Sequence, residues 1–262
     1  MPSAGTPIRR YVALGDSSTE GLDDPKAAGG YRGWSERLAQ HIAVSQGDDL
    51  EYANLAIRGR STREVRGEQL AAALALKPDF ATLFVGTNDV TAPRFDEAQF
   101  AADFEAMQRA LREADASVLS FTLPDLTPVM PLARFVRGRV LRMNDRIRES
   151  SARTGSLIVD FAAAPVTSDP RLWSDDRIHA NSEGHARMAA ALAQAIGLPG
   201  HDDWDAALAV LPQRSIGARA GAEIGWWARH FAPWIGRSLT GQTSGDGLEP
   251  KYPEPVDVSA LE

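Results

Sequence analysis

The chain has 262 residues, of which 44% are apolar, with a formal net charge of −7 and no cysteine. These values suit a folded protein of one large domain, or of a domain with an appendage. They exclude disulfides and cysteine-based sites and argue against a general nucleic-acid binder. No run approaches the roughly 18 apolar residues of a membrane span, and residues 1–10 hold no signal-peptide-like stretch. We therefore expect a cytoplasmic protein without stable membrane insertion.

Strands and helices are predicted to alternate along the first three quarters of the chain. Short apolar runs predict strands over 10–14, 50–55, 80–85, 117–123 and 156–161. Apolar residues at helical spacing predict helices over 33–45, 62–76, 97–114, 132–153 and 182–196. This alternation predicts an α/β fold with a parallel sheet and helices on both of its faces.

Three polar loops each follow a predicted strand directly. They are GDSSTEG at 15–21, AIRGRS at 56–61 and GTND at 86–89. In open parallel sheets the ligand site lies beyond the carboxyl ends of the strands. The three loops should therefore gather at one edge of the sheet and form the site.

The first of these loops contains adjacent hydroxyls, Ser17 and Ser18, and allows three interpretations. A phosphate-binding loop would need a lysine or closer glycines than Gly15 and Gly21, and the two acids of the loop would repel a phosphate. A helix cap would use the hydroxyls without any chemistry. A nucleophile would need a general base and a third group that orients this base.

Among the five histidines, His179 is the candidate base. It lies in the polar loop DDRIHAN before the last predicted helix, three residues after Asp176. One turn can present both side chains to the same place, so that the carboxylate accepts from Nδ1 while Nε2 faces the serine. His41 and His185 fall inside predicted helices, where a structural role is the expected one.

A nucleophilic serine also needs donors for the negative charge that develops on the substrate oxygen. Gly59 can offer a backbone N–H, because glycine permits close approach, and Asn88 can offer its side-chain amide. Taken singly, Gly59 can equally be a turn residue, and Asn88 can equally cap its own loop. Their shared position after predicted strands favours the functional interpretation.

In this order the residues resemble the SGNH hydrolases, also called GDSL-type esterases and lipases, whose four blocks supply Ser, Gly, Asn and His. The chain has GDS at 15–17, NLAIRG at 54–59, GTND at 86–89 and D-x-x-H at 176–179. The last two blocks fit closely and the glycine block fits most loosely. Ser18 stands where the family often has a larger apolar residue. The resemblance extends from residue 11 to about residue 196.

The resemblance implies a flavodoxin-like three-layer α/β/α sandwich with a five-stranded parallel sheet. It also implies a lipase-like carboxylic ester hydrolase that forms an acyl-enzyme and uses no cofactor and no metal. In this family pattern Ser17 is the nucleophile, His179 is the general base, and Asp176 orients the histidine. The backbone N–H groups of Ser17 and Gly59 and the side chain of Asn88 form the oxyanion hole.

The chain is expected to divide into three parts. A catalytic domain covers 1–199, a Trp-rich helical extension covers 200–240, and a tail rich in Pro, Gly and acidic residues covers 241–262. The aromatic stripe at 224–235 is expected to pack on the catalytic domain. A homo-oligomer contact through 221–240 or the tail, and a membrane-interface helix, are the alternatives.

The expected substrate is a small-molecule ester. No long apolar insertion is evident that would build a deep acyl tunnel, so we expect short acyl chains. An acyltransferase that uses the same groups is the alternative function. A non-catalytic binding module is less favoured, because all four block residues are present. Asp16 is expected to fix its loop, and the role of Ser18 stays open.

Overall fold

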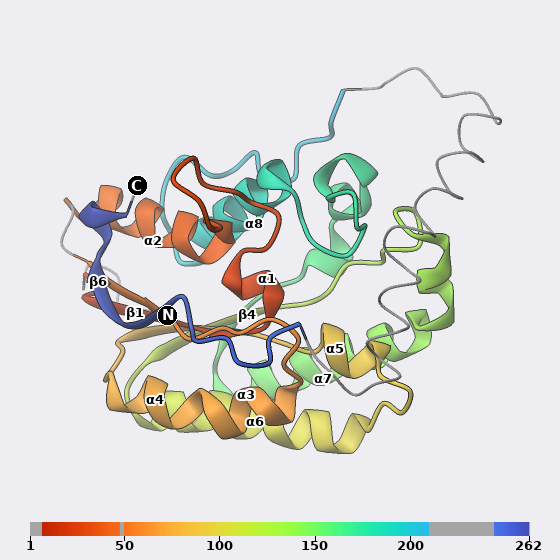
Figure 1. Ribbon diagram of the computed structural model, residues 1–262, viewed down its shortest axis with the longest axis horizontal. Helices are drawn as coiled ribbons and strands as arrows, with labels where there is room; N and C mark the ends of the chain where they lie inside the picture. Colours follow the sequence, from red (N-terminus) through yellow and green to blue (C-terminus); the bar gives the residue numbers. More distant parts are fainter. Residues whose placement is uncertain (1–6, 48–49, 210–243, 262) are drawn as a thin grey trace.

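The computed structural model describes residues 7–47, 50–209 and 244–261. Within these ranges, six strands form one sheet in the order β5-β4-β3-β1-β2-β6, with helices on both faces (Figure 1). The strands are β1 (Arg10–Gly15), β2 (Glu51–Asn54), β3 (Phe80–Phe84), β4 (Ser117–Phe121), β5 (Leu157–Val159) and β6 (Tyr252–Asp257). Strands β1 to β5 are parallel, which confirms the predicted flavodoxin-like core of five parallel strands.

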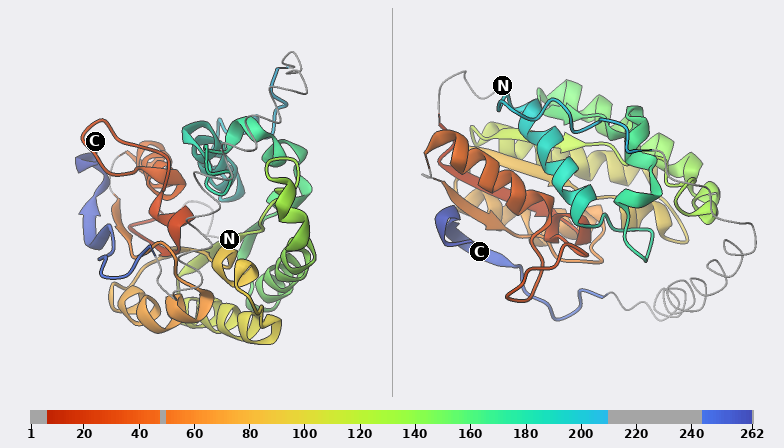
Figure 2. Two further views of the ribbon diagram at one scale, coloured as in Figure 1. Left: turned by 45° about the vertical axis from the view of Figure 1, so that its right-hand side comes forward. Right: turned by 90° about the horizontal axis from the view of Figure 1, so that it is seen from above.

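The helices form the two outer layers of the sandwich (Figure 2). One face of the sheet carries α1 (Ser17–Glu20), α2 (Gly33–Gln46) and α8 (Ser182–Ala195). The other face carries α3 (Thr62–Glu68), α4 (Leu70–Ala75), α5 (Thr87–Thr91), α6 (Glu97–Glu113) and α7 (Arg137–Thr154). Helix α2 packs on α8, and α6 packs on α7. None of the described helices combines the length and the apolar character needed to cross a membrane.

The two central strands explain why their sequences are almost continuously apolar. Every residue of β3 and every residue of β1 after Arg10 is buried, because helices cover both faces. The polar atoms that this burial encloses find partners inside the core. The hydroxyl of Tyr11 on β1 forms a 2.8 Å hydrogen bond with that of Thr82 on β3. The core thus fixes the positions from which the loops of the site leave the sheet.

The sixth strand corrects the sequence-based expectation that 241–262 is only a tail. Strand β6 pairs antiparallel with β2, opposing Asp257 to Glu51 and Val256 to Tyr52. The sequence YPEPVD hid this strand, because proline is depleted from strands. The two prolines occupy alternate positions, so their missing N–H groups fall on one side, which an edge strand can leave unpaired.

Two predicted helices begin or continue differently from the expectation. The helix predicted over 62–76 is broken at Gln69, which separates α3 from α4. The helix predicted over 132–153 starts with a separate 3₁₀ turn, Pro131–Phe135, before α7. The side chain of Gln69, at the junction of α3 and α4, hydrogen-bonds the backbone of Gly15 at the end of β1.

The predicted Trp-rich stripe at 224–235 lies outside the described residues. The described part of the predicted extension, 200–209, runs along the catalytic domain. The ring of Trp204 meets Phe161 edge-on at a centroid distance of 5.6 Å, and its carbonyl accepts a 3.0 Å hydrogen bond from Arg187. These contacts place 200–209 beside the carboxyl edge of the sheet.

Candidate active site

The loops that follow β1, β2 and β3 meet at the carboxyl edge of the sheet, as their order in the sequence predicts. Strands β1 and β3 are neighbours, and the chain order runs in opposite directions on either side of them. This is the topological switch point at which open α/β sheets bind their ligands.

Ser17 is delivered by the end of β1 and begins the short helix α1. The turn between them needs Gly15, because a Cβ at this position would lie 2.2 Å from the carbonyl oxygen of Phe84 on β3. Gln69 secures the same turn, since its amide accepts from the N–H of Gly15 and donates to its carbonyl, both at 2.9 Å. We did not predict this role. The available signal was a polar residue on the buried stripe of a predicted helix.

Asp16 is fully buried and joins two of the loops. Its carboxylate caps α1 by accepting from the N–H of Ser18 at 3.1 Å, and it accepts from the Asn88 amide at 3.4 Å. Burial raises the pKa of Asp16 to about 7, against the hydrogen bond from Ser18 and the charge of His179, which lower it. The carboxyl therefore fixes its loop, as expected, and also contacts the asparagine block.

The loop before α8 holds Asp176 rigidly beneath His179. One oxygen of the carboxylate accepts hydrogen bonds from the Ser174 hydroxyl at 2.7 Å and from the N–H groups of Ile178 and His179 at 2.9 Å. The other oxygen lies 2.5 Å from Nδ1 of His179. With both oxygens engaged, the carboxylate cannot rotate away from the imidazole.

Ser17, His179 and Asp176 form one continuous hydrogen-bonded chain. A carboxylate accepts only, so Nδ1 carries the proton that it donates to Asp176, and Nε2 is left to accept from the Ser17 hydroxyl at 2.8 Å. Burial alone would lower the pKa of His179, but the hydrogen bond and the charge of Asp176 raise it above its ordinary value. Burial alone would raise the pKa of Asp176, but the hydrogen bond and the charge of His179 lower it far below its ordinary value.

A second carboxylate faces the same imidazole. Asp23, in the loop after α1, places Oδ2 3.9 Å from Nδ1 of His179. Within the described ranges, Asp23, Asp176 and His179 are the set of acidic and imidazole groups whose geometry would suit a metal ion. The arrangement can also be explained without a metal ion, because Nδ1 of His179 donates a hydrogen bond to Asp176.

Gly59 and Asn88 lie in the loops on either side of Ser17. Gly59 adopts a φ of 78°, a left-handed conformation that glycine accepts without strain. Asn88, in the first turn of α5, donates to the carbonyl of Arg60 at 3.0 Å as well as to Asp16. In the described part of the chain, no acceptor is found for the backbone N–H of Ser17 or of Gly59. These two donors remain available to a ligand.

Two further acids support these loops and were not predicted to do so. Asp89 accepts from the N–H and the hydroxyl of Thr62 at 2.9 and 3.0 Å, which ties the GTND loop to the start of α3. Glu20, at the end of α1, accepts from the N–H of Arg58 at 2.9 Å and pairs with its guanidinium. The available signal was that each acid stands within three residues of a predicted site residue.

The neighbouring serine and histidine are placed differently from Ser17 and His179. The Ser18 hydroxyl accepts a 3.3 Å hydrogen bond from the indole N–H of Trp34. His185 is buried in α8, where Nδ1 accepts from the N–H of Trp34 at 3.0 Å and Nε2 donates to the carbonyl of Leu22 at 2.9 Å. His185 thus has the structural role expected of it, and neither ring nitrogen is free.

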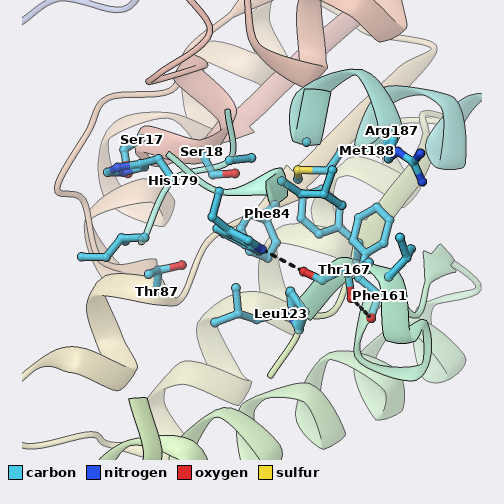
Figure 3. A pocket seen from close by; sticks show the side chains of 18 of the residues that line it. Ser17, Ser18, Phe84, Thr87, Leu123, Phe161, Thr167, His179, Arg187 and Met188 are labelled. Carbon is cyan, nitrogen blue, oxygen red and sulfur yellow. Dashed lines mark hydrogen bonds between the residues drawn. The ribbon is translucent and has the colours of Figure 1, made fainter. Parts of the chain in front are cut away.

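An apolar pocket extends from Ser17 and His179 toward α8 (Figure 3). Its volume is about 60 Å³. The walls come from the ends of β3, β4 and β5, from the 163–175 segment and from α8, and include Phe84, Phe121, Phe161, Leu172, Trp173 and Met188. The segment that closes the far side is held in place by a 2.9 Å hydrogen bond from the indole of Trp173 to the carbonyl of Thr167.

Several solved structures share the fold of this chain. LAE5, an alpha/beta hydrolase enzyme from the metagenome of Lake Arreo, Spain, is similar in structure with a TM-score of 0.62 at 22% identity, over 73% of this chain and 96% of that chain. The lipase/acylhydrolase from Enterococcus faecalis is similar with a TM-score of 0.59 at 22% identity, over 72% of this chain and 95% of that chain. The acetyl xylan esterase AlAXEase is similar with a TM-score of 0.59 at 21% identity, over 71% of this chain and 99% of that chain. These likenesses show a shared fold.

Comparison with curated proteins gave no match. The family profile described as the GDSL-like Lipase/Acylhydrolase family matches residues 13–187, which is well over half of the chain and includes the loops of all four blocks. The chain therefore belongs to the GDSL-like lipase/acylhydrolase family.

Proposed function

We propose that this ester hydrolase works through an acyl-enzyme formed on Ser17. The observation that carries the proposal is the hydrogen-bonded chain of hydroxyl, imidazole and carboxylate, with 2.8 Å between Ser17 and His179 and 2.5 Å between His179 and Asp176. A nucleophilic hydroxyl needs a base within hydrogen-bond reach and a third group that orients this base. All three are in place without any rearrangement.

In the first half of the reaction, Nε2 of His179 takes the hydroxyl proton while the Ser17 oxygen attacks the acyl carbon. The imidazolium then returns this proton to the departing alcohol, and the acyl group stays bound to Ser17. In the second half, His179 takes a proton from water while the water oxygen attacks the acyl carbon. The imidazolium then gives this proton to Oγ of Ser17 as the bond between Oγ and the acyl carbon breaks, which releases the carboxylic acid and restores the serine. Asp176 stabilises the imidazolium in both halves.

The oxyanion would be held by three donors, which are the N–H groups of Ser17 and Gly59 and the side-chain amide of Asn88. The N–H groups of Ser17 and Gly59 lack acceptors in the described part of the chain, and the Asn88 amide makes one of its two hydrogen bonds at the long distance of 3.4 Å. The second amide hydrogen of Asn88 can therefore turn to the oxyanion at little cost. Preorganised donors of this kind stabilise the charge that develops in the transition state.

The pocket supports a short acyl group. Its mainly apolar lining suits a hydrocarbon chain. The volume of about 60 Å³ is only a few times the roughly 10–15 Å³ that a single water molecule needs. We infer that acetyl to butyryl groups fit, and that longer chains must displace Trp173 or the other residues of the closing segment.

The test compares Ser17→Ala with Ser18→Ala, a matched control one residue away. Ser17→Ala should lower kcat for p-nitrophenyl acetate by at least about 10⁴, because the nucleophile is lost. Ser18→Ala should keep kcat within a fewfold, because this hydroxyl accepts from Trp34, whereas the Ser17 hydroxyl contacts His179. Substantial turnover by Ser17→Ala, or an equal loss in both variants, would overturn the proposed nucleophile.

A p-nitrophenyl ester series from acetate to octanoate tests the acyl preference separately. We expect kcat/KM to be highest for the short esters and to fall beyond butyrate. A maximum at octanoate would contradict the inferred pocket depth, and it would leave the assignment of Ser17 untouched.

A further inference from the structure

The C-terminal segment described here, 244–261, contacts two of the loops that form the candidate active site. In Figure 1 it is the blue segment that runs along the sheet, where β6 pairs with the outer edge of β2. It lies outside the residues 13–187 that the family profile matches. Its contacts with the loops after β1 and β2 therefore come from outside the matched part of the chain.

The first contact is made by Gly245 on the peptide group that carries the Gly59 N–H. A Cβ at Gly245 would lie 2.0 Å from the carbonyl oxygen of Arg58 and 2.9 Å from a methyl group of Ile57. The Arg58 carbonyl and the Gly59 N–H belong to one planar trans peptide, so they point in opposite directions. A group that contacts the Arg58 carbonyl oxygen therefore fixes the direction in which the Gly59 N–H points on the opposite side of the peptide.

The other groups around this peptide leave it little freedom. Glu20 of α1 accepts from the N–H of Arg58, and Asn88 of α5 donates to the carbonyl of Arg60. The guanidinium of Arg60 also pairs with Asp246 at 3.3 Å, next to Gly245 in the chain. Helices α1 and α5 thus hold the peptides on either side of the one that carries the Gly59 N–H, and the C-terminal segment contacts that peptide itself.

The second contact is made by Lys251 on the end of the nucleophile helix. Its ammonium donates to the carbonyls of Tyr31 and Arg32 at 2.7 Å and to that of Glu20, the last residue of α1, at 3.4 Å. It also pairs with the fully buried carboxylate of Glu36 at 3.0 Å. One side chain of the segment therefore joins the end of α1 to the start of α2.

The segment is anchored firmly enough to act as a support. Glu36 pairs with Lys26 at 2.6 Å as well as with Lys251, and Lys26 donates to the hydroxyl of Tyr252 at 3.2 Å. Tyr252 also packs edge-on against Tyr52 of β2. A buried carboxylate with two ammonium partners is costly to separate, because removal of either partner leaves charge uncompensated.

We propose that 244–261 is a positioning element of the active site, in which Gly245 aims the Gly59 N–H at the oxyanion and Lys251 steadies the helix that carries Ser17. The inference rests on the proposed function, since it assigns Gly59 to the oxyanion hole. Gly245 and Lys251 are positioning residues, and neither is expected to touch the substrate.

The test introduces one methyl group behind the Gly59 peptide, by Gly245→Ala. The matched control is Gly67→Ala, because a Cβ at Gly67 meets nothing within 4 Å. Since the contact at Gly245 is with backbone, the loop must shift, and we expect kcat for p-nitrophenyl acetate to fall about ten- to a hundredfold. KM should stay within about twofold, and Gly67→Ala should match the wild type in both.

Three further readouts separate positioning from simple destabilisation. The rate at which a p-nitrophenyl phosphonate modifies Ser17 should fall in parallel with kcat, because its tetrahedral oxygen uses the same donors. The acid limb of the kcat/KM profile should not move, because His179 and Asp176 are untouched. The Tm of Gly245→Ala should stay well above the assay temperature.

A second variant, Lys251→Met, keeps the aliphatic stem and removes the ammonium, and it should lower kcat severalfold by freeing the end of α1. Wild-type kcat in a folded Gly245→Ala overturns the proposal, as does failure of both variants to fold, which would make the segment a stability element only. The proposed function is judged separately by Ser17→Ala, so the two inferences can fail independently.

Discussion

Two histidines that lie close together in the sequence meet opposite surroundings. In the loop before α8, Nδ1 of His179 faces the carboxylates of Asp176 and Asp23, and its pKa is raised. Inside α8, His185 is fully enclosed between a backbone N–H and a backbone carbonyl, and burial lowers its pKa to about 4.

The difference shows that partners, and not residue type, decide what an imidazole can do. His185 has one acceptor and one donor for its two nitrogens, an arrangement that requires the neutral ring and leaves no nitrogen free. His179 has an acceptor on one side and a hydroxyl proton on the other, so it can take that proton and be stabilised as a cation. Each of the following predictions tests one of these two histidines, by changing the histidine or a carboxylate that faces it.

The largest expected effect comes from Asp176→Asn. The amide cannot impose the tautomer that leaves Nε2 of His179 unprotonated, nor can it stabilise the imidazolium, so kcat should fall by about 10³–10⁴. The matched control is Asp175→Asn, which changes an exposed neighbour and should keep wild-type kcat. Steady-state kinetics on both variants checks this, and a loss below tenfold for Asp176→Asn would contradict the role given to the carboxylate.

The next effect is on stability and comes from His185→Ala. The substitution leaves the N–H of Trp34 and the carbonyl of Leu22 without partners and opens a cavity, so the free energy of unfolding should drop by about 3–5 kcal/mol. His201→Ala, which removes a less buried imidazole, should cost less than about 1 kcal/mol. Urea unfolding measures both, and equal costs would show that the buried hydrogen bonds of His185 contribute little.

The third effect is the pH dependence of that stability. The folded pKa of His185 is about 4, and its unfolded value is about 6.5, so the unfolded state binds the extra proton between these values. The contribution of His185 is complete above pH 6.5 and is lost as the pH falls toward 4, on the order of 3 kcal/mol. His185→Gln should flatten this part of the wild-type curve, and an unchanged slope would refute the assignment.

The smallest expected effect comes from Asp23→Asn. The kcat/KM profile should fall in acid as His179 protonates, with a midpoint above the ordinary value of histidine, because Asp176, Asp23 and Asp16 all raise the pKa of the imidazole. Removing the charge of Asp23, which is partly exposed and therefore screened, should move the acid limb down by a few tenths of a pH unit. A shift of the acid limb to higher pH would show that Asp23 does not act through its charge.

The fold was largely predictable because its strands are buried on both faces. Continuous apolar runs at β1 and β3 can hardly form anything else, and the spacing between runs fixes the crossover helices. Strand β6 was not predictable, because its two prolines and its acids resemble a tail until β2 is placed beside it. Local composition cannot show that an edge strand far away in the sequence lacks a partner.

The candidate site was predictable where one short motif holds the whole geometry. Asp176 and His179 stand on a single turn, and Ser17 directly follows a strand. The supports of the site depend on contacts between distant elements. Gln69 reaches Gly15 only because α3 packs beside the end of β1, and no pattern within 62–76 shows where that side chain goes. The pocket likewise needs three strand ends and the 163–175 segment together.

The pairing of β6 with β2 also bears on how the protein is made. Strand β6 follows β2 by roughly 200 residues, which at about 5–20 residues per second takes roughly 10–40 s to synthesise. During that interval the outer edge of β2 has no partner from β6, and unpaired strand edges are templates for association between chains. The outer edge of β2 therefore stays open to association between nascent chains until β6 pairs with it.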